Sequence, residues 1–562
     1  MAQNSSSSEG DRLLQEGVQL FQQGTAESIR EALQKLEAAR QAYRAAGNAA
    51  GEAAALLGMG SIFNLLGDKQ TALDYFNQSL PLTRQVGDKA IEAVTLNNIG
   101  AVYDALGDKQ TALDYYNQSL PLYRQVGEKK GEAVTLSNIG RVYFALGEWQ
   151  TALDYFERSL PLFQQVGDKA QEATTLNNIG MVYDVLGDKQ TALDYLNQSL
   201  PLFQQVGDKA GVATTLSNIG RVYSALGDKQ TALDYYNQSL PLSRQVGDKA
   251  IEAVTLTSIG LVYSALGEWQ TALDYYDRSL PLRKQVGDKA GEAITLNNIG
   301  LVYDALGDKQ TALDYLNQSL PLSRQVGDKR QEARTLNNIG GVYSDLGEKQ
   351  TALDYYNQSL PLSRQVGDKA GVALTLNNIG ALYSALGDKQ TALDYYNQSL
   401  PLSRQVGDKA QEAVTLNNIG RVYDALGDKQ TALDYYNQSL PLRREVGDKT
   451  GEVATLNNLA WTKRSQGNLT EALTDMEAAI AIIEDLRTKI DSEQLRQSYF
   501  AQNQGEYEFY IDLLMQLHQQ NPDKGYDKQA LSASERARAR TLLEILAEAN
   551  ADIRTGVDPE LR

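Results

Sequence analysis

The sequence has no cysteine and a single histidine, His518, among its 562 residues. The absence of cysteine excludes disulfides, thiolate metal sites and a cysteine nucleophile, and it agrees with a reducing compartment. No Gly-rich phosphate loop and no cluster of metal-ligating residues stands out either. We therefore expect no enzymatic activity, no cofactor and no metal.

Positive charge and long apolar runs are also scarce. The chain carries 53 Lys and Arg against 71 Asp and Glu, a net charge of -18, so it should repel the phosphates that dominate nucleic-acid affinity. No apolar run is long enough to span a bilayer, and the opening MAQNSSSSEG lacks the apolar core of a signal peptide. These features predict a cytoplasmic protein that binds neither nucleic acid nor membrane.

Proline is rare as well, and ten of the 12 prolines recur every forty residues, from Pro81 to Pro441. Blocks of forty residues from Gly51 align ten near-identical units over residues 51–450, each close to GEAVTLNNIGAVYDALGDKQTALDYYNQSLPLYRQVGDKA. Degenerate copies at 11–50 and 451–490 resemble capping repeats. We expect residues 1–10 to be disordered and residues 491–562 to form a helical cap and linker toward a missing effector domain.

Each unit predicts two amphipathic helices. In residues 91–130, Leu96, Ile99 and Tyr103 recur at three- and four-residue spacing, as one face of a helix does. Ala112 and Tyr116 begin a second stripe of the same kind. The unit is therefore expected to fold as an antiparallel hairpin of a helix A and a helix B.

Capping residues place the ends of these helices. Asp88 and Asp108 are good N-caps for helices A and B, and Gly107 tolerates the left-handed conformation at the end of helix A. Gly100, inside helix A, costs roughly 1 kcal/mol relative to Ala, so it indicates close approach of the two helices.

These positions resemble the tetratricopeptide repeat signature of the W-x2-L-G-x2-Y…A-x3-F type. The matching residues of one unit are Leu96, Ile99, Gly100, Tyr103, Gly107, Ala112, Tyr116 and Leu120. The match covers roughly residues 11–490, and the forty-residue length with the motif TLNNIG is similar to the kinesin-light-chain-like subclass. The resemblance implies an all-α, right-handed superhelical solenoid of antiparallel helix pairs that binds proteins or peptides.

Two segments near the C-terminus carry a second resemblance. LRQSYFAQNQGEYEFYIDLLMQLHQQNP and ASERARARTLLEILAEANADIRTGVDPEL resemble the region that joins tetratricopeptide arrays to CHAT domains, caspase-like peptidase modules common in cyanobacteria. That family cleaves with a His and Cys dyad, whereas this chain has no Cys and stops at Arg562, where the module is expected to start. The resemblance implies the recognition or regulatory arm of a CHAT-type peptidase protein.

One face of helix A points away from the apolar stripe. It holds Val94, Asn98 and Ala101, and the family resemblance places it along a concave groove. A row of Asn amides, which both donate and accept, can pair with the backbone of an extended peptide. The predicted ladder comprises Asn98, Asn138, Asn178, Asn218, Asn298, Asn338, Asn378, Asn418 and Asn458. Alternatively, these amides bridge neighbouring helices, the role expected for the adjacent Asn97.

The residue three positions after each ladder Asn varies between units and should tune specificity. Arg141, Arg221 and Arg421 occupy it in three units, and Arg334 lies on the same face. Arginines favour a ligand with carboxylates, because they form bidentate charge-assisted hydrogen bonds. The alternative is that they are solvated or paired with acids of a neighbouring unit.

Aromatic residues suggest packing rather than ligand contact. Tyr115 and Tyr116 are predicted in the core, and Trp149 and Trp269, which replace a lysine, are predicted to pack on a neighbouring helix end. Two functional hypotheses remain. The chain grips an extended segment in its groove, or it is an assembly scaffold that self-associates or docks partners through its outer surface, which near-identical units favour.

Overall fold

The structure is a computed structural model that describes residues 2–490, 499 and 503–536. Helices alternate along the chain as A and B, and the described residues contain no strand, which confirms the all-α solenoid. The A helices are α1 (Ala2–Gln23), α3 (Ala49–Leu65), α5 (Lys89–Leu106), α7 (Lys129–Ala145), α9 (Lys169–Leu186), α11 (Lys209–Ala225), α13 (Lys249–Ala265), α15 (Lys289–Ala305), α17 (Lys329–Asp345), α19 (Lys369–Leu386), α21 (Lys409–Leu426) and α23 (Lys449–Ser465). The B helices are α2 (Ala26–Ala46), α4 (Lys69–Val86), α6 (Lys109–Val126), α8 (Trp149–Val166), α10 (Lys189–Val206), α12 (Lys229–Val246), α14 (Trp269–Gln285), α16 (Lys309–Val326), α18 (Lys349–Gln365), α20 (Lys389–Val406), α22 (Lys429–Val446) and α24 (Leu469–Thr488).

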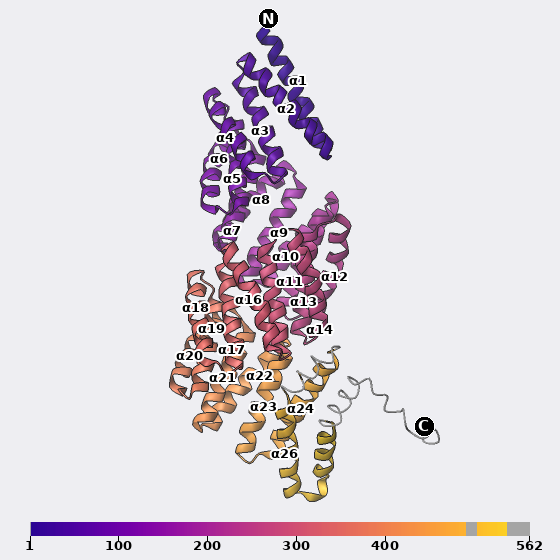
Figure 1. Ribbon diagram of the computed structural model, residues 1–562, viewed down its shortest axis with the longest axis vertical. Helices are drawn as coiled ribbons and strands as arrows, with labels where there is room; N and C mark the ends of the chain where they lie inside the picture. The colour runs from indigo at the N-terminus through magenta and orange to yellow at the C-terminus, as the bar shows by residue number, and fades with distance from the viewer. Residues whose placement is uncertain (1, 491–498, 500–502, 537–562) are drawn as a thin grey trace, which may run out of the picture. The chain divides into compact units, whose positions relative to one another are not determined.

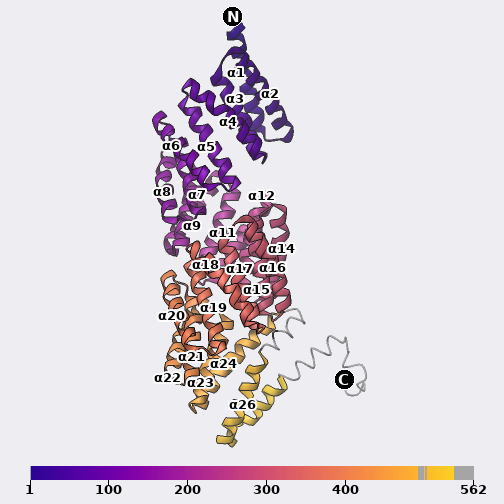
Figure 2. The same ribbon diagram turned by 60° about the vertical axis from the view of Figure 1, so that its left-hand side comes forward.

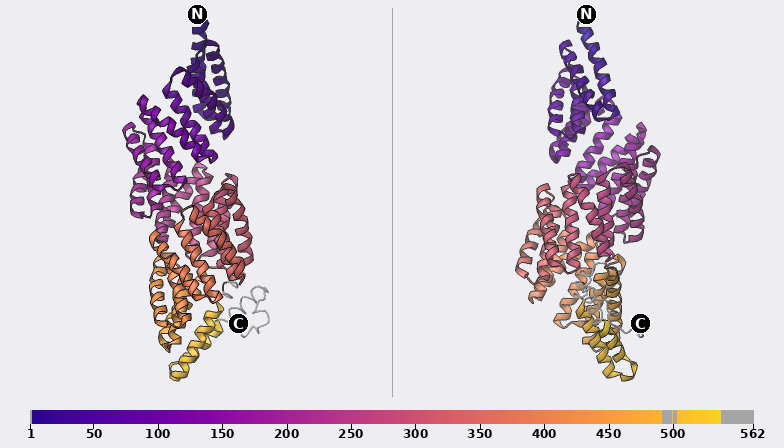
Figure 3. Two further views of the ribbon diagram at one scale, coloured as in Figure 1. Left: turned by 90° about the vertical axis from the view of Figure 1, so that its left-hand side faces the viewer. Right: turned by 45° about the vertical axis from the view of Figure 1, so that its right-hand side comes forward.

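The chain divides into two compact units, residues 1–215 and 216–562, with the boundary inside α11. In unit 1 the helices from α3 to α9 lie side by side in chain order (Figures 1 and 2). In unit 2 the same order holds from α12 to α24 (Figure 3). Each A helix from α3 to α9 and from α13 to α23 packs on the B helix that follows it and on the B helix that precedes it, so neighbouring repeats share their cores.

The predicted caps and close approach are confirmed in the unit of α5 and α6. Asp88 accepts hydrogen bonds from the backbone of the first turn of α5, and Gly107 ends that helix with φ of 88°. Asp108 caps α6 in the same way. A Cβ added to Gly100 would lie 2.8 Å from the ring of Tyr116, which is buried, so only glycine lets the two helices pack this closely.

Residues 1–10 were expected to be disordered, whereas α1 begins at Ala2 in the structure. The start of α1 packs on α2, where an added Cβ at Gly10 would meet the ring of Tyr43 at 2.7 Å. The hydroxyl of Tyr43 also donates a hydrogen bond to Asp11 at 2.7 Å. The first hairpin therefore uses these residues as the beginning of its A helix.

Past the last repeat, α26 (Gln504–Gln520) is followed by a 3-10 turn at Pro522–Lys524 and by helical residues 526–536. Gly525 has φ of 73° and ends the turn in the left-handed region, which glycine tolerates. Of the helical cap and linker predicted over residues 491–562, residues 491–498, 500–502 and 537–562 lie outside the described residues. Phe509 of α26 stacks on Trp461 of α23 with ring centroids 4.2 Å apart, so α26 caps the last repeat.

The N-caps make stability depend on pH. Hydrogen bonds from the hydroxyl and the backbone N–H of the threonine three residues on lower the pKa of five cap aspartates from 3.8. They are Asp68, Asp108, Asp228, Asp388 and Asp428. Their stabilisation is present above the unfolded pKa and is lost as pH falls through the lower folded pKa.

We therefore expect the urea midpoint of unfolding to decrease when the pH is lowered from 5 to 2. The decrease should be smaller in a variant with these five aspartates changed to Asn than in the parent. Asparagine also caps helices but does not titrate. Circular dichroism in urea at each pH measures the two slopes, and equal slopes would contradict this role of the caps.

Candidate groove and the asparagine ladder

The A helices form the inner side of each unit. Successive A helices contact one another, from α3 to α9 in unit 1 and from α13 to α23 in unit 2, whereas successive B helices do not approach as closely. Each array therefore curves toward its A helices. The exposed part of the A-helix surface carries the residues equivalent to Val94, Asn98 and Ala101, and we call this surface the groove face.

The ladder asparagines are half-buried on the groove face, except Asn298, which is buried. Several of them donate a hydrogen bond from Nδ2 to the Oδ1 of the first Asn of the NNIG motif in the preceding repeat. These pairs are Asn138 to Asn97 at 3.3 Å, Asn338 to Asn297 at 2.9 Å, Asn378 to Asn337 at 3.2 Å, Asn418 to Asn377 at 3.1 Å and Asn458 to Asn417 at 3.0 Å. The ladder amides thus bridge neighbouring repeats, and the acceptor, which is the first Asn of the NNIG motif, serves the packing of the repeats.

Three ladder amides lack this partner, the first being Asn98, which is preceded by Leu57 at the acceptor position. The Nδ2 atoms of Asn178 and Asn298 are buried without a hydrogen bond. The preceding repeats carry Ser137 and Thr257 where the acceptor Asn stands in other units. These side chains are shorter and carry no amide oxygen, so the bridge is missing at these two repeats.

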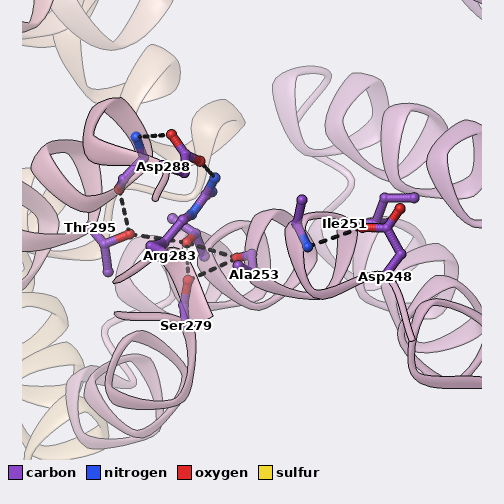
Figure 4. Close-up of polar contacts among 10 residues, drawn as sticks. Asp248, Ile251, Ala253, Ser279, Arg283, Asp288 and Thr295 are labelled. Atoms are coloured by element: carbon purple, nitrogen blue, oxygen red, sulfur yellow. Dashed lines mark hydrogen bonds and ion pairs between the residues drawn. The ribbon is translucent and has the colours of Figure 1, made fainter. Parts of the chain in front are cut away.

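A layer of buried hydroxyls lies beneath the ladder. Ser279 of α14 donates to the carbonyl of Ala253 at 2.9 Å, which joins helix B to helix A of the same repeat (Figure 4). Thr257 contacts the hydroxyls of Ser279 at 2.8 Å and of Thr295, in the next repeat, at 3.3 Å. This layer was not predicted from the sequence. The serine equivalent to Ser279 recurs at the same position of every near-identical unit, and such a recurring small polar residue could have indicated it.

The chemistry of the groove face changes along unit 2. Val254 and Leu261 of α13 and Ile294 and Leu301 of α15 are exposed, so two consecutive repeats offer apolar side chains. The next A helix, α17, presents the exposed Arg334 at the position equivalent to Val94. A partner laid along this face would therefore meet an apolar stretch and then positive charge.

The predicted specificity arginines differ in their surroundings. Arg141 pairs with Asp104 of the preceding repeat at 3.2 Å, and Arg334 lies 4.0 Å from Asp368 of the next repeat. Arg221 is half-buried on α11. Arg421 is exposed on α21, and the equivalent of Asp104 in the preceding repeat is Ser384, which carries no charge. The expected acid pairing thus occurs for Arg141 and weakly for Arg334.

Tyrosine takes two roles that the sequence did not separate. Tyr116 is buried, as predicted, and burial raises its pKa. Tyr115 is only half-buried and stacks on Tyr103 with ring centroids 5.6 Å apart. The equivalent pair stacks in every repeat from Phe63 with Tyr75 to Tyr423 with Tyr435, which reinforces each hairpin.

Among the described residues, no three His, Cys, Asp or Glu side chains gather as metal ligands would. Measured over the same residues, every helix is too short or too polar to cross a membrane.

A family model for the tetratricopeptide repeat matches residues 82–125, 131–205, 192–245, 251–325, 310–365, 331–405 and 371–445. A second tetratricopeptide model matches residues 453–486. These matches cover more than half of the sequence, so the chain belongs to the tetratricopeptide repeat family. Proteins of this family are typically interaction scaffolds.

The chain is also similar to solved structures of low sequence identity. BtubC (BKLC) from P. vanneervenii is 19% identical, with 44% of this chain and 93% of that chain covered and a TM-score of 0.34. A Rap protein solved in complex with competence and sporulation factor is 13% identical, with 71% and 99% covered and a TM-score of 0.41. The tetratricopeptide sensor protein PH0952 from Pyrococcus horikoshii, a STAND ATPase, is 12% identical, with 65% and 55% covered and a TM-score of 0.45. No curated protein matches the sequence.

Proposed function

We propose that the chain binds an extended segment of another protein along the groove face of its A helices. The observation that carries the proposal is the ladder itself. Five ladder amides spend one N–H on the preceding repeat and stay half-buried, so that the second N–H can pair with a ligand. The carbonyl oxygens of Asn138 and Asn378 also accept hydrogen bonds, from Arg141 and Asn377. Amides fixed by such bridges are already oriented, so less rotamer entropy is lost on binding.

The subclass and the setting of this activity are part of the same proposal. The motif TLNNIG and the forty-residue repeat support the kinesin-light-chain-like subclass. The tail segments quoted above support a recognition or regulatory arm of a CHAT-type peptidase protein acting in the cytoplasm. The segment in the groove then belongs to a separate partner or to a C-terminal CHAT effector domain.

The test is selection of extended peptides from a random 16-residue display library on the intact chain. Affinities of selected peptides are then measured by fluorescence anisotropy for the parent and for the variant Asn298→Ala, Asn338→Ala, Asn378→Ala and Asn418→Ala. Each net hydrogen bond contributes about 0.5 to 1.5 kcal/mol, so the quadruple variant should bind at least about thirtyfold more weakly.

The matched control replaces Asn357, Asn397 and Asn437, exposed on the B helices, with Ala and should bind as the parent does. Circular dichroism fixes a temperature at which every variant is folded. A folded ladder variant with parental affinity would place recognition elsewhere, and a library that yields no binder would reject groove binding.

A further inference from the structure

The turns between helices A and B form one edge of the solenoid, and each carries a leucine just before its glycine. Most of these leucines are exposed, for example Leu106 at 53%, although a leucine gains by burial. The ends of the B helices form the opposite edge and carry a valine at the equivalent place, such as Val126. Both edges thus repeat an apolar side chain every forty residues.

Within unit 2 these two edges pack on each other. A Cβ added to Gly227, in the turn before α12, would lie 3.2 Å from the carbonyl oxygen of Glu445 at the end of α22, five repeats further on. Val446 is half-buried there, whereas Val126 and most other valines of this edge are exposed. Burial at this turn also lowers the pKa of Lys229.

The next turn repeats the contact with α24, again five repeats on. Gly267 packs against Leu486, and the Trp269 ring lies 5.0 Å from that of Tyr499. Leu306, in the following turn, is fully buried in the same cluster. The turn edge is therefore a surface that accepts helix ends, although Leu226 stays 52% exposed at the first of these contacts and Leu306 is the turn leucine that becomes fully buried.

Three later turns of unit 2 leave this surface open. Leu346, Leu386 and Leu426 are 49%, 54% and 55% exposed. The opposite edge is open in unit 1, where Val86, Val126, Val166 and Val206 form an uninterrupted exposed run. In unit 2 that run is interrupted by the half-buried Val366 and Val446.

We propose that the turn edge of unit 2 at Leu346, Leu386 and Leu426 binds the B-helix ends of unit 1 of a second copy of this chain. The argument is continuity with the contact already made inside unit 2. At the Gly227 turn both sides of that contact come from near-identical repeats, so the backbone positions that form it recur on both open edges. The two edges differ, so the contact is heterologous and links the copies head to tail.

The net charge of -18 opposes assembly of copies and is screened by salt. Sedimentation velocity of the full chain, without peptide, should therefore show a sedimentation coefficient that rises with concentration, and more steeply at 0.5 M than at 0.05 M salt. A coefficient that stays constant across concentration and salt overturns the proposal.

Variants test the two edges separately. Changing Leu346, Leu386 and Leu426 to Lys should raise the dissociation constant for self-association at least about tenfold. The control with Asn357, Asn397 and Asn437 changed to Lys adds the same charge on the exposed outer face of the same repeats and should associate more than the leucine variant. Equal association of the two variants would show that the turn edge is not the contact.

A mixing experiment tests whether the turn edge of one copy contacts the B-helix ends of another copy. Chains with Val86, Val126, Val166 and Val206 changed to Glu keep the turn edge, and the leucine variant keeps the valine edge. Each variant alone should stay monomeric, and the mixture should stop at a 1:1 complex. A mixture with no complex, with both variants folded by circular dichroism, overturns the proposal. Because no peptide is present, these outcomes are independent of groove binding.

Discussion

Replacing Trp269 with Ala should destabilise unit 2 by about 3 to 5 kcal/mol, the range for removing a large buried aromatic side chain. The tryptophan is 3% exposed and joins α14 to Leu486, Ile490 and Tyr499 in one hydrophobic cluster. Its loss opens a cavity between two parts of the solenoid that lie five repeats apart in the chain. Urea denaturation followed by circular dichroism measures the change.

Trp149 offers a matched control, because it stands in the same GEWQTALDY sequence three repeats earlier in the chain. It is only half-buried, so Trp149→Ala should cost about 1 to 2 kcal/mol. Lysine, the usual residue at this position, should be tolerated at 149 and not at 269. Equal losses at the two positions would show that the contact with the C-terminal helices contributes nothing to stability.

Local features of the repeat could be predicted from the sequence. Asp88, Asp108 and Gly107 end or begin helices as expected, because capping depends on residues within one turn of the helix. Tyr116 is in the core and Gly100 lies against it, since helical spacing alone placed them on facing sides of one hairpin.

Contacts between repeats were harder to predict. The bond from Asn138 to Asn97 joins residues of different repeats and depends on the angle between successive A helices, which a helical wheel does not contain. Trp269 was expected on a neighbouring helix end, but the helix that covers it follows five repeats later, at a distance set by the curvature of the whole array. Such contacts depend on the sum of the small rotations between successive repeats, which no local sequence pattern specifies.

Substitutions in the ladder should have a second large effect on stability. The size of this effect should depend on the repeat, because the ladder amides bridge to the preceding repeat in some repeats and not in others. Asn378 and Asn418 donate to Asn337 and Asn377, which are 3% and 2% exposed. Replacing both donors with Ala leaves two buried carbonyl oxygens without these partners, at about 1 to 3 kcal/mol each. We expect the double variant to lose about 2 to 6 kcal/mol of unfolding free energy.

The same substitutions at Asn178 and Asn298 form the matched control, because their Nδ2 atoms are buried without a partner. Removing a buried unsatisfied donor should leave stability within about 1 kcal/mol of the parent or raise it. Thermal and urea unfolding of the two double variants compare them directly. We therefore expect ladder substitutions to leave the melting transition nearly unchanged at repeats preceded by Ser137 or Thr257 and to lower it where the acceptor is Asn. If both double variants lost the same stability, the inter-repeat bonds would not be the cause, and the ladder would stabilise the array through packing of the side chains alone.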